Sequence, residues 1–246
     1  MDRFKGLKIG IQSFSLRGYD LPTAVQKTKE LGLGYIEWAK KHLGVGADPA
    51  TIENAKRLCA EAGIEINCVG VGNIPADMNV ARPIFEFARA MGVKTIMANP
   101  MKDSMDTLDK LTDEFRICVG IHNHGPTSDW PDIETIDSAI KGHSERIGLC
   151  VDTGHFTRVP VDPMDVFRHF GDRVHSVHLK DIEVDVDGKH GQERIIGDGP
   201  LDLKAVLDWL RAKNFQGPIS IEYELNPQDP MADLRVALDR IEKELQ

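Results

Sequence analysis

Residues 116–152, RICVGIHNHGPTSDWPDIETIDSAIKGHSERIGLCVD, contain one complete copy of the pattern that decides the fold. A short apolar run (116–123) precedes a segment with helical periodicity (132–142), and a second short apolar run (147–152) follows. Short apolar runs of this kind are typical of strands buried in a parallel sheet, and the amphipathic segment between them is typical of a crossover helix. The stretch therefore predicts a β–α–β unit.

The same alternation recurs along the whole chain. Strands are expected over residues 7–14, 34–38, 64–71, 93–99, 116–123, 147–152, 174–180 and 218–224. Helices are expected over residues 21–32, 47–63, 80–92, 106–115, 132–142, 162–171, 202–214 and 229–245. Eight such pairs without a linker predict an α/β protein with one domain over residues 1–246, a closed (β/α)8 TIM barrel. No glycine-rich dinucleotide fingerprint follows the first strand, which argues against an open doubly wound sheet.

The composition excludes several classes of partner. The net charge is −9, and Lys and Arg form no cluster with interleaved aromatic residues, which argues against a nucleic-acid surface. No apolar run approaches the length of about eighteen residues that a membrane span needs. The first residues are too polar for a signal peptide, and the four cysteines show no C-x-x-C pairing. We therefore expect a cytoplasmic protein with reduced cysteines and no nucleic-acid or membrane partner.

Polar side chains gather at the ends of four neighbouring predicted strands, where a barrel of this kind carries its active site. The ends of the fifth to eighth strands carry, in chain order, His122, His124, Asp152, His155, His178, Lys180, Glu222 and Glu224. Each has an ordinary structural explanation by itself, but carboxylates buried inside apolar runs are costly without a partner. Two imidazoles and two carboxylates that converge on one point suit a divalent ion such as Mn²⁺, Mg²⁺, Co²⁺ or Zn²⁺. The sequence therefore predicts a metal site.

Four motifs carry a resemblance to a known family. DTGH (152–155), HLKD (178–181), GDGPLD (197–202) and IEYE (221–224) resemble those of the xylose-isomerase-like TIM-barrel superfamily. Within it the chain is similar to sugar phosphate isomerases and epimerases, which are related to endonuclease IV-type barrels. The resemblance extends over essentially the whole chain. The endonuclease branch needs extra histidines on the third and fourth strands, where this chain lacks them, so DNA repair is not expected.

The resemblance implies a set of ligands for one divalent ion, with Mn²⁺ as the first expectation and Mg²⁺, Co²⁺ or Zn²⁺ as alternatives. In this superfamily a carboxylate on strand five, Asp on strand six, His on strand seven and Glu on strand eight typically hold the ion. These roles fall on His122, Asp152, His178 and Glu222. The chain departs from the pattern at position 122, where a glutamate is usual. The choice between His122 and His124 as the ligand therefore stays open.

The resemblance implies proton chemistry next to a carbonyl. The first expectation is a metal-dependent isomerase or epimerase that acts on a sugar, keto-sugar or cyclitol through an enediolate. In this hypothesis Glu222 and His124 exchange protons with the substrate and Lys180 steadies an oxyanion. The alternative is a lyase or dehydratase that eliminates a β-substituent from a keto-sugar or inosose, because inosose dehydratases and the barrel subunits of 3-keto-glycoside lyases also resemble this chain. The third hypothesis is a sugar-binding barrel without catalysis.

Further residues are expected to contact the small-molecule substrate. The resemblance implies this role for His155, and the predicted loops at the strand ends add Glu224, Glu37, His42 and Arg158. The segment GVGN (70–73) is a glycine pair that lacks the rest of a phosphate-binding motif. Asp187-Gly188 is expected to form a hairpin turn. The sequence leaves the identity of the sugar and the oligomeric state open, a homo-oligomer included.

Overall fold

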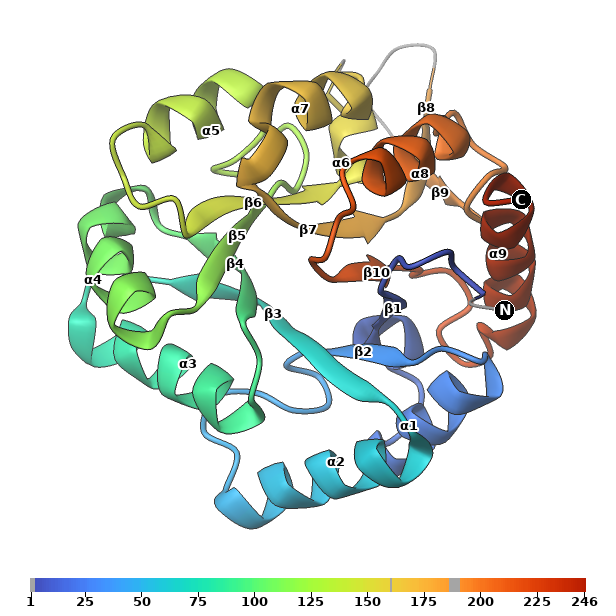
Figure 1. The fold of residues 1–246 in the computed structure, drawn as a ribbon, viewed down its shortest axis with the longest axis horizontal. Coiled ribbons are helices and arrows are strands. Elements are labelled where there is room, and N and C mark those ends of the chain that lie inside the picture. The colour runs from blue at the N-terminus through green and yellow to red at the C-terminus, as the bar shows by residue number, and fades with distance from the viewer. Residues whose placement is uncertain (1–2, 160, 186–190) are drawn as a thin grey trace.

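The computed structural model describes residues 3–159, 161–185 and 191–246, and in these ranges eight parallel strands close into a barrel (Figure 1). Around the barrel the order is β1, β10, β7, β6, β5, β4, β3 and β2. The strands are β1 (Ile9–Gln12), β2 (Tyr35–Trp38), β3 (Glu65–Ile74), β4 (Thr95–Pro100), β5 (Cys118–His122), β6 (Ile147–Asp152), β7 (Val174–Leu179) and β10 (Ile219–Ile221). The predicted TIM barrel is confirmed.

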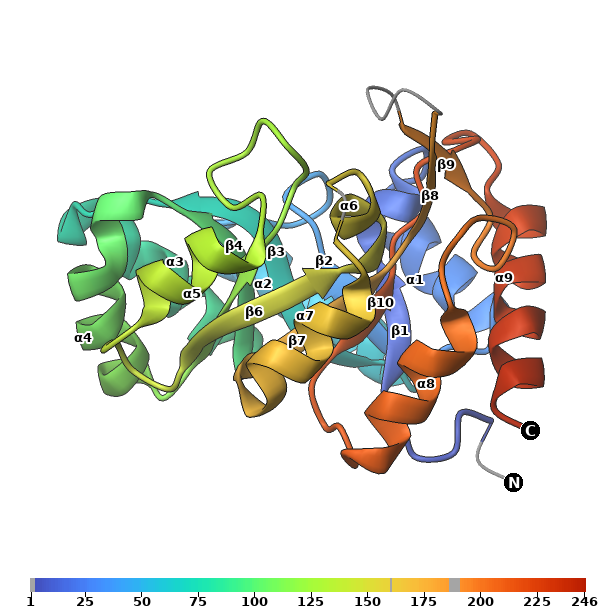
Figure 2. The ribbon, with the colours of Figure 1, turned by 90° about the horizontal axis from the view of Figure 1, so that it is seen from above.

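Helices surround the barrel, and each barrel strand is followed by one of the predicted helices (Figures 1 and 2). They are α1 (Leu21–Glu30), α2 (Pro49–Ala62), α3 (Met78–Met91), α4 (Met105–Phe115), α5 (Ile133–Ile140), α7 (Pro163–Phe170), α8 (Leu203–Ala212) and α9 (Met231–Glu244). A further helix of five residues, α6 (Thr153–Thr157), follows β6 directly. No helix in the described parts of the chain is long and apolar enough to cross a membrane.

Helix ends follow local sequence signals. Seven helices in the described ranges begin behind an aspartate whose carboxylate accepts a hydrogen bond from a backbone N–H in the first turn, at Asp20, Asp48, Asp77, Asp132, Asp152, Asp162 and Asp202. Such a cap satisfies a donor that the helix itself leaves free, and it typically contributes about 1 kcal/mol. Helices α2 and α3 end at Gly63 and Gly92, whose φ angles of 75° and 79° favour glycine.

The buried residues form two layers of different character. Apolar side chains fill the space between the strands and the surrounding helices. Inside the barrel a small cluster of Cys68, Met97 and Cys150 closes the floor. Above this floor the interior is polar: Asp152 pairs in register with His178, and His178 pairs in register with Ser220. The carboxyl ends of the strands therefore place ionisable groups at one end of the barrel.

A two-stranded antiparallel sheet follows β7. It consists of β8 (Asp181–Val184) and β9 (Gly191–Arg194), which project beyond the barrel in Figure 2. The predicted turn at Asp187-Gly188 lies outside the described residues. The sequence analysis placed no strand at β9, and its pairing with β8 brings residue 193 towards the strand ends.

Candidate metal centre

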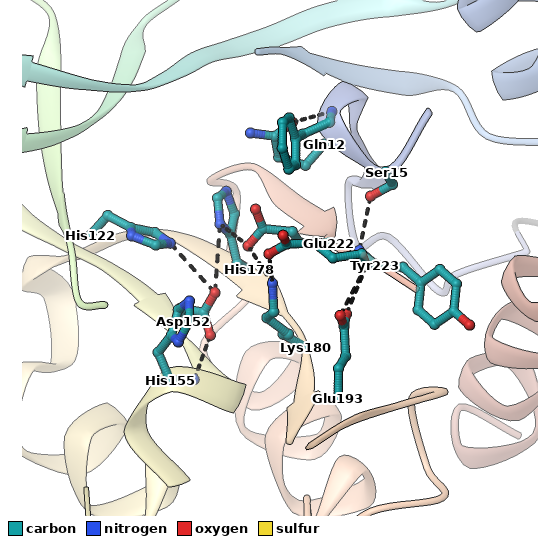
Figure 3. A network of polar contacts seen from close by, with 12 residues as sticks. Gln12, Ser15, His122, Asp152, His155, His178, Lys180, Glu193, Glu222 and Tyr223 are labelled. Atoms are coloured by element: carbon teal, nitrogen blue, oxygen red, sulfur yellow. Dashed lines mark hydrogen bonds and ion pairs between the residues drawn. The ribbon is translucent and has the colours of Figure 1, made fainter. Parts of the chain in front are cut away.

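Four side chains from neighbouring strands converge at the carboxyl end of the barrel (Figure 3). His122 ends β5, Asp152 ends β6, His178 lies on β7, and Glu222 follows β10 directly. All four are buried, and one potential ligand atom from each lies within 4.8 Å of the others. The structure thus brings together the four residues that were predicted as metal ligands.

The spacing of these atoms fits a coordinated ion. His122 Nε2 lies 3.4 Å from Asp152 Oδ2, and His178 Nδ1 lies 3.2 Å from Glu222 Oε2 and 3.9 Å from Asp152 Oδ2. Ligands that each lie about 2.1 Å from one ion are separated from each other by about 3.0–3.4 Å.

The same atoms lack hydrogen-bond partners. Within the described residues, no hydrogen bond reaches Asp152 Oδ2, His178 Nδ1, Glu222 Oε2 or either ring nitrogen of His122. Buried polar atoms are normally paired, because an unpaired one loses its hydration without compensation. A divalent ion bound by these atoms would supply the missing interaction, so the residues present fit a metal.

Two of the four side chains are oriented by contacts on their other side. Asp152 Oδ1 accepts the backbone N–H of His155 at 2.7 Å, which caps α6 and leaves Oδ2 for the cluster. His178 Nε2 lies 3.0 Å from Glu37 Oε2, which leaves Nδ1 facing the cluster. A carboxylate behind a ligating histidine fixes the ring and its tautomer.

Glu37 therefore has a place different from the predicted one. It was expected to contact the substrate, but it is 0% exposed and lies behind His178 on β2. Burial alone would lower the pKa of His178, but Cys150, Glu37 and Glu222 together raise it well above its usual value. Glu37 is thus a partner of the cluster.

A second group of imidazoles borders the cluster. The ring centroid of His124 lies 5.7 Å from that of His122 and 4.2 Å from that of His155. His155 Nδ1 lies 3.2 Å from the guanidinium of Arg158. Burial lowers the pKa of His155 to about 3, and partial burial, followed by the neighbouring His122, lowers the pKa of His124.

Lys180 lies on the other side of the cluster, and it is 2% exposed. Its ammonium contacts Glu224 Oε1 and lies 3.5 Å from Glu222 Oε2. Burial opposes its charge, but the carboxylates of Glu222, Asp152 and Glu193 raise its pKa. Lys180 was predicted to steady an oxyanion of the substrate. In the structure its ammonium already contacts the carboxylates of Glu222 and Glu224.

Glu193 is a site residue that the sequence analysis missed. Its carboxylate accepts the backbone N–H of Glu224 at 2.9 and 3.1 Å (Figure 3). Burial, and after it the repulsion from Glu224 and Glu222, raises the pKa of Glu193 to about 7, against the opposing effect of Lys180. Its segment GQER carries no periodic signal, so only the β8–β9 pairing reveals its place.

Asn123 is a second residue whose role the sequence did not show. Its amide Oδ1 accepts the N–H of Asp152 at 2.9 Å, and its Nδ2 donates to the carbonyl of Asp152 at 3.1 Å. The side chain between His122 and His124 therefore ties the ends of β5 and β6 together.

A cavity of about 380 Å³ opens on the cluster. His122, His124, Glu222 and Glu224 line it, together with amide side chains from the first, third and fourth strands, Gln12, Asn73 and Asn99. His42 does not line it: its Nε2 lies 3.1 Å from the backbone carbonyl of Tyr19, so it is held by the loop after β1. Polar side chains that can form hydrogen bonds therefore surround the predicted ligands.

The comparisons with known proteins agree with this arrangement. A family model described as xylose isomerase-like TIM barrel matches residues 25–243. Inosose dehydratase from Clostridium tetani (strain Massachusetts / E88) is 31% identical over 137 residues, which are 50% of this chain and 46% of that protein. The chain spans about half the length of the curated relatives that it matches in this way.

Solved structures share the fold over nearly the whole chain. A protein from Parabacteroides distasonis ATCC 8503 has a TM-score of 0.74 at 26% identity, over 97% of this chain and 99% of that one. The IolI protein with a bound zinc atom has a TM-score of 0.76 at 16% identity, over 98% and 99%. A 3-keto-D-glucoside 4-epimerase from E. coli has a TM-score of 0.74 at 18% identity, over 96% and 99%. The last two likenesses concern the fold alone. Because the family model covers residues 25–243, this chain belongs to the xylose isomerase-like TIM barrel family.

Proposed function

We propose that the protein is a metal-dependent enzyme that removes a proton next to the carbonyl group of a small, sugar-like substrate. The observation that carries the proposal is the set of unpaired buried atoms on His122, Asp152, His178 and Glu222, which meet beside a cavity large enough for a sugar. Mn²⁺ is the ion we propose first, with Mg²⁺, Co²⁺ and Zn²⁺ as alternatives, because all four accept mixed imidazole and carboxylate ligands.

Two residues are proposed to exchange protons with the substrate. A divalent ion at the four ligands would polarise the carbonyl and stabilise the negative charge that develops when the neighbouring C–H bond ionises. Glu222 and His124 both line the cavity, so each can reach a bound molecule. One removes the α-proton, and the other delivers a proton to the carbon skeleton or to a leaving group. Lys180 holds Glu222 and Glu224 in place from behind.

Two outcomes share this first step. In dehydration the electron pair of the broken C–H bond forms a C=C bond, the β C–O bond breaks, and hydroxide leaves as water with a proton from the second group. In isomerisation or epimerisation the same enediolate is reprotonated. The 31% identity to an inosose dehydratase favours dehydration. The two proton-transfer groups in the cavity, an imidazole and a carboxylate, also suit a base and a separate acid.

The test begins with metal content. The chain should bind about one equivalent of divalent ion, whereas less than about a tenth of an equivalent after reloading would contradict the proposal. A surface group of Asp106, Asp109 and His143 also offers potential ligand atoms within 4.8 Å of one another. The variant His143→Ala should therefore keep the bound ion if the buried cluster holds it.

The reaction is then followed in D₂O with an inosose, ketoses and 3-keto-sugars. Loss of water from the inosose supports dehydration, and solvent deuterium at the α-carbon of an otherwise intact sugar supports isomerisation or epimerisation. Absence of exchange with every compound would instead support the third hypothesis, a sugar-binding barrel without catalysis. His124→Ala should abolish exchange and keep the metal, with His143→Ala as the matched control. Loss of the metal in His124→Ala would make His124 the ligand of β5 in place of His122.

A further inference from the structure

A second cavity adjoins the one at the metal cluster. It has a volume of about 270 Å³ and lies where α3 packs against β3, under the segment that joins β2 to α2. Lys40, Val71, Gly72 and Asn73 line both cavities. The two cavities therefore adjoin along the end of β3, at the GVGN segment that the sequence analysis left without a function.

The second cavity differs in chemistry from the first. Its walls are mainly apolar, and they include Leu43, Val45, Val71, Ile84, Phe87 and Met97. Val45 is 50% exposed, so the outer rim is open to solvent. A buried apolar cavity of about 150 Å³ is large enough to bind benzene, so this volume accommodates a ring with a short extension. A polyol would gain little here, whereas an aryl or alkyl group would be removed from water.

Gly72 lies where the two cavities adjoin. A Cβ atom added at this position would meet no heavy atom of the described residues within 4 Å, and the residue has no positive φ angle that would require glycine. Packing and backbone geometry therefore do not explain the missing side chain. A side chain at position 72 would therefore enter open space where the two cavities adjoin.

We propose that the substrate carries an apolar aryl or alkyl substituent, which occupies this second cavity while the polar, carbonyl-bearing part lies at the metal cluster. The inference rests on the proposed function for the polar part, and it adds the chemical class of the rest of the molecule. The four residues that line both cavities place the apolar space directly beside the polar one, which supports a single ligand with a polar and an apolar part.

Metal-binding hydroxamates test the proposal without knowledge of the substrate. Acetohydroxamate presents the metal-binding head alone, and 4-phenylbutanohydroxamate adds an aryl tail. With the metal-loaded chain we expect the aryl compound to bind about 30-fold more tightly, because the ring leaves water for an apolar cavity. Equal dissociation constants for the two compounds would overturn the proposal.

Two glycine variants locate the effect. Gly72→Leu should reduce the preference, measured as the ratio of the two dissociation constants, to less than about threefold. Gly34→Leu is the matched control, because a Cβ there also meets nothing within 4 Å and the residue precedes β2 at the opposite end of the barrel. A preference that persists in Gly72→Leu would place the aryl tail elsewhere and overturn the assignment.

A measurement without metal separates this inference from the proposed function. Binding of 4-fluorobenzyl alcohol to the metal-free chain is followed by ¹⁹F NMR. A saturable shift that is lost in Val80→Trp, at the rim of the cavity, and kept in Val236→Trp, on α9, supports the apolar subsite even if no hydroxamate binds. No saturable shift, or equal loss in both variants, overturns the subsite, whatever the metal experiments show.

Discussion

At the scale of single residues, the contact between Glu37 and His178 orients one of the four predicted metal ligands. Glu37 is fully buried, and its carboxylate lies 3.0 Å from His178 Nε2. A carboxylate can only accept a hydrogen bond, so the ring donates from Nε2, and Nδ1 is the nitrogen that faces the cluster. The ligand is therefore pre-oriented by a residue that lines no part of the cavity.

This contact predicts the effect of Glu37→Gln. The variant keeps the size of the side chain but removes the charge that makes the His178 ring a stronger ligand, so metal affinity should fall about tenfold or more. Competition with a chromophoric chelator measures the change. Glu61→Gln, which alters an exposed glutamate on α2, is the control and should bind metal like the wild type. Unchanged affinity in Glu37→Gln would mean that Glu37 does not orient the ligand.

The buried carboxyl of Glu193 predicts a pH dependence of stability. Its pKa is raised from 4.5 to about 7 in the folded chain, so between these values the folded state holds a proton that the unfolded state has lost. Stability therefore falls as the pH rises through this window, and the loss is complete above pH 7. Glu193→Gln carries no such charge, so its melting temperature relative to the wild type should rise from pH 4.5 to pH 8 in calorimetry. A constant difference would contradict the raised pKa.

At the scale of elements, Asp181 at the start of β8 organises the loop that leads into α8. It is 1% exposed, and its carboxylate accepts the N–H groups of Gly197, Gly199 and Leu201. A Cβ at Gly199 would come within 2.2 Å of Asp181 Oδ1, so only glycine permits this approach. The GDGPLD motif is thus a loop wrapped around one buried carboxylate.

Asp181→Ala should therefore destabilise the fold. Three N–H groups would lose a charged acceptor, which predicts a loss of about 3 kcal/mol in the free energy of unfolding. Asp198→Ala, in the same loop, removes only an exposed ion pair with Arg240 and should cost less than about 1 kcal/mol. Denaturant unfolding of both variants measures the difference, and equal losses would show that the loop does not depend on Asp181.

The helices and strands also show which parts of the structure the sequence patterns could predict. The strands and long helices have enough residues to display a period, so all eight pairs could be predicted. Helix α6 has five residues and β9 four, too few for a period, and β9 depends on pairing with β8. The alternation of strands and helices predicted which polar residues lie at the strand ends, and the family resemblance selected the four ligands among them. The contacts of Glu37 and Glu193 join residues far apart in the chain, and no local pattern encodes them.

At the scale of the whole molecule, the barrel buries most of an ionic cluster at the carboxyl end of its strands. Asp152 and His178 are 0% exposed, and Glu222 is 7% exposed. Lys180 offsets part of the carboxylate charge, but the unpaired atoms of the cluster retain a desolvation cost. An ion that binds the folded chain alone would remove this cost, so metal binding and folding should be coupled.

Removal of the metal should therefore lower the melting temperature of the whole barrel. An ion present at a thousand times its dissociation constant stabilises the folded state by about 4 kcal/mol, which corresponds to roughly 8–16 °C for a domain of this size. Calorimetry with EDTA and after addition of Mn²⁺ measures the shift. Glu222→Gln should show a smaller shift, because it weakens one ligand of the cluster, whereas His143→Ala should keep the full shift. If the shift is instead lost in His143→Ala, the ion that stabilises the barrel binds at the surface group and the buried cluster folds without it.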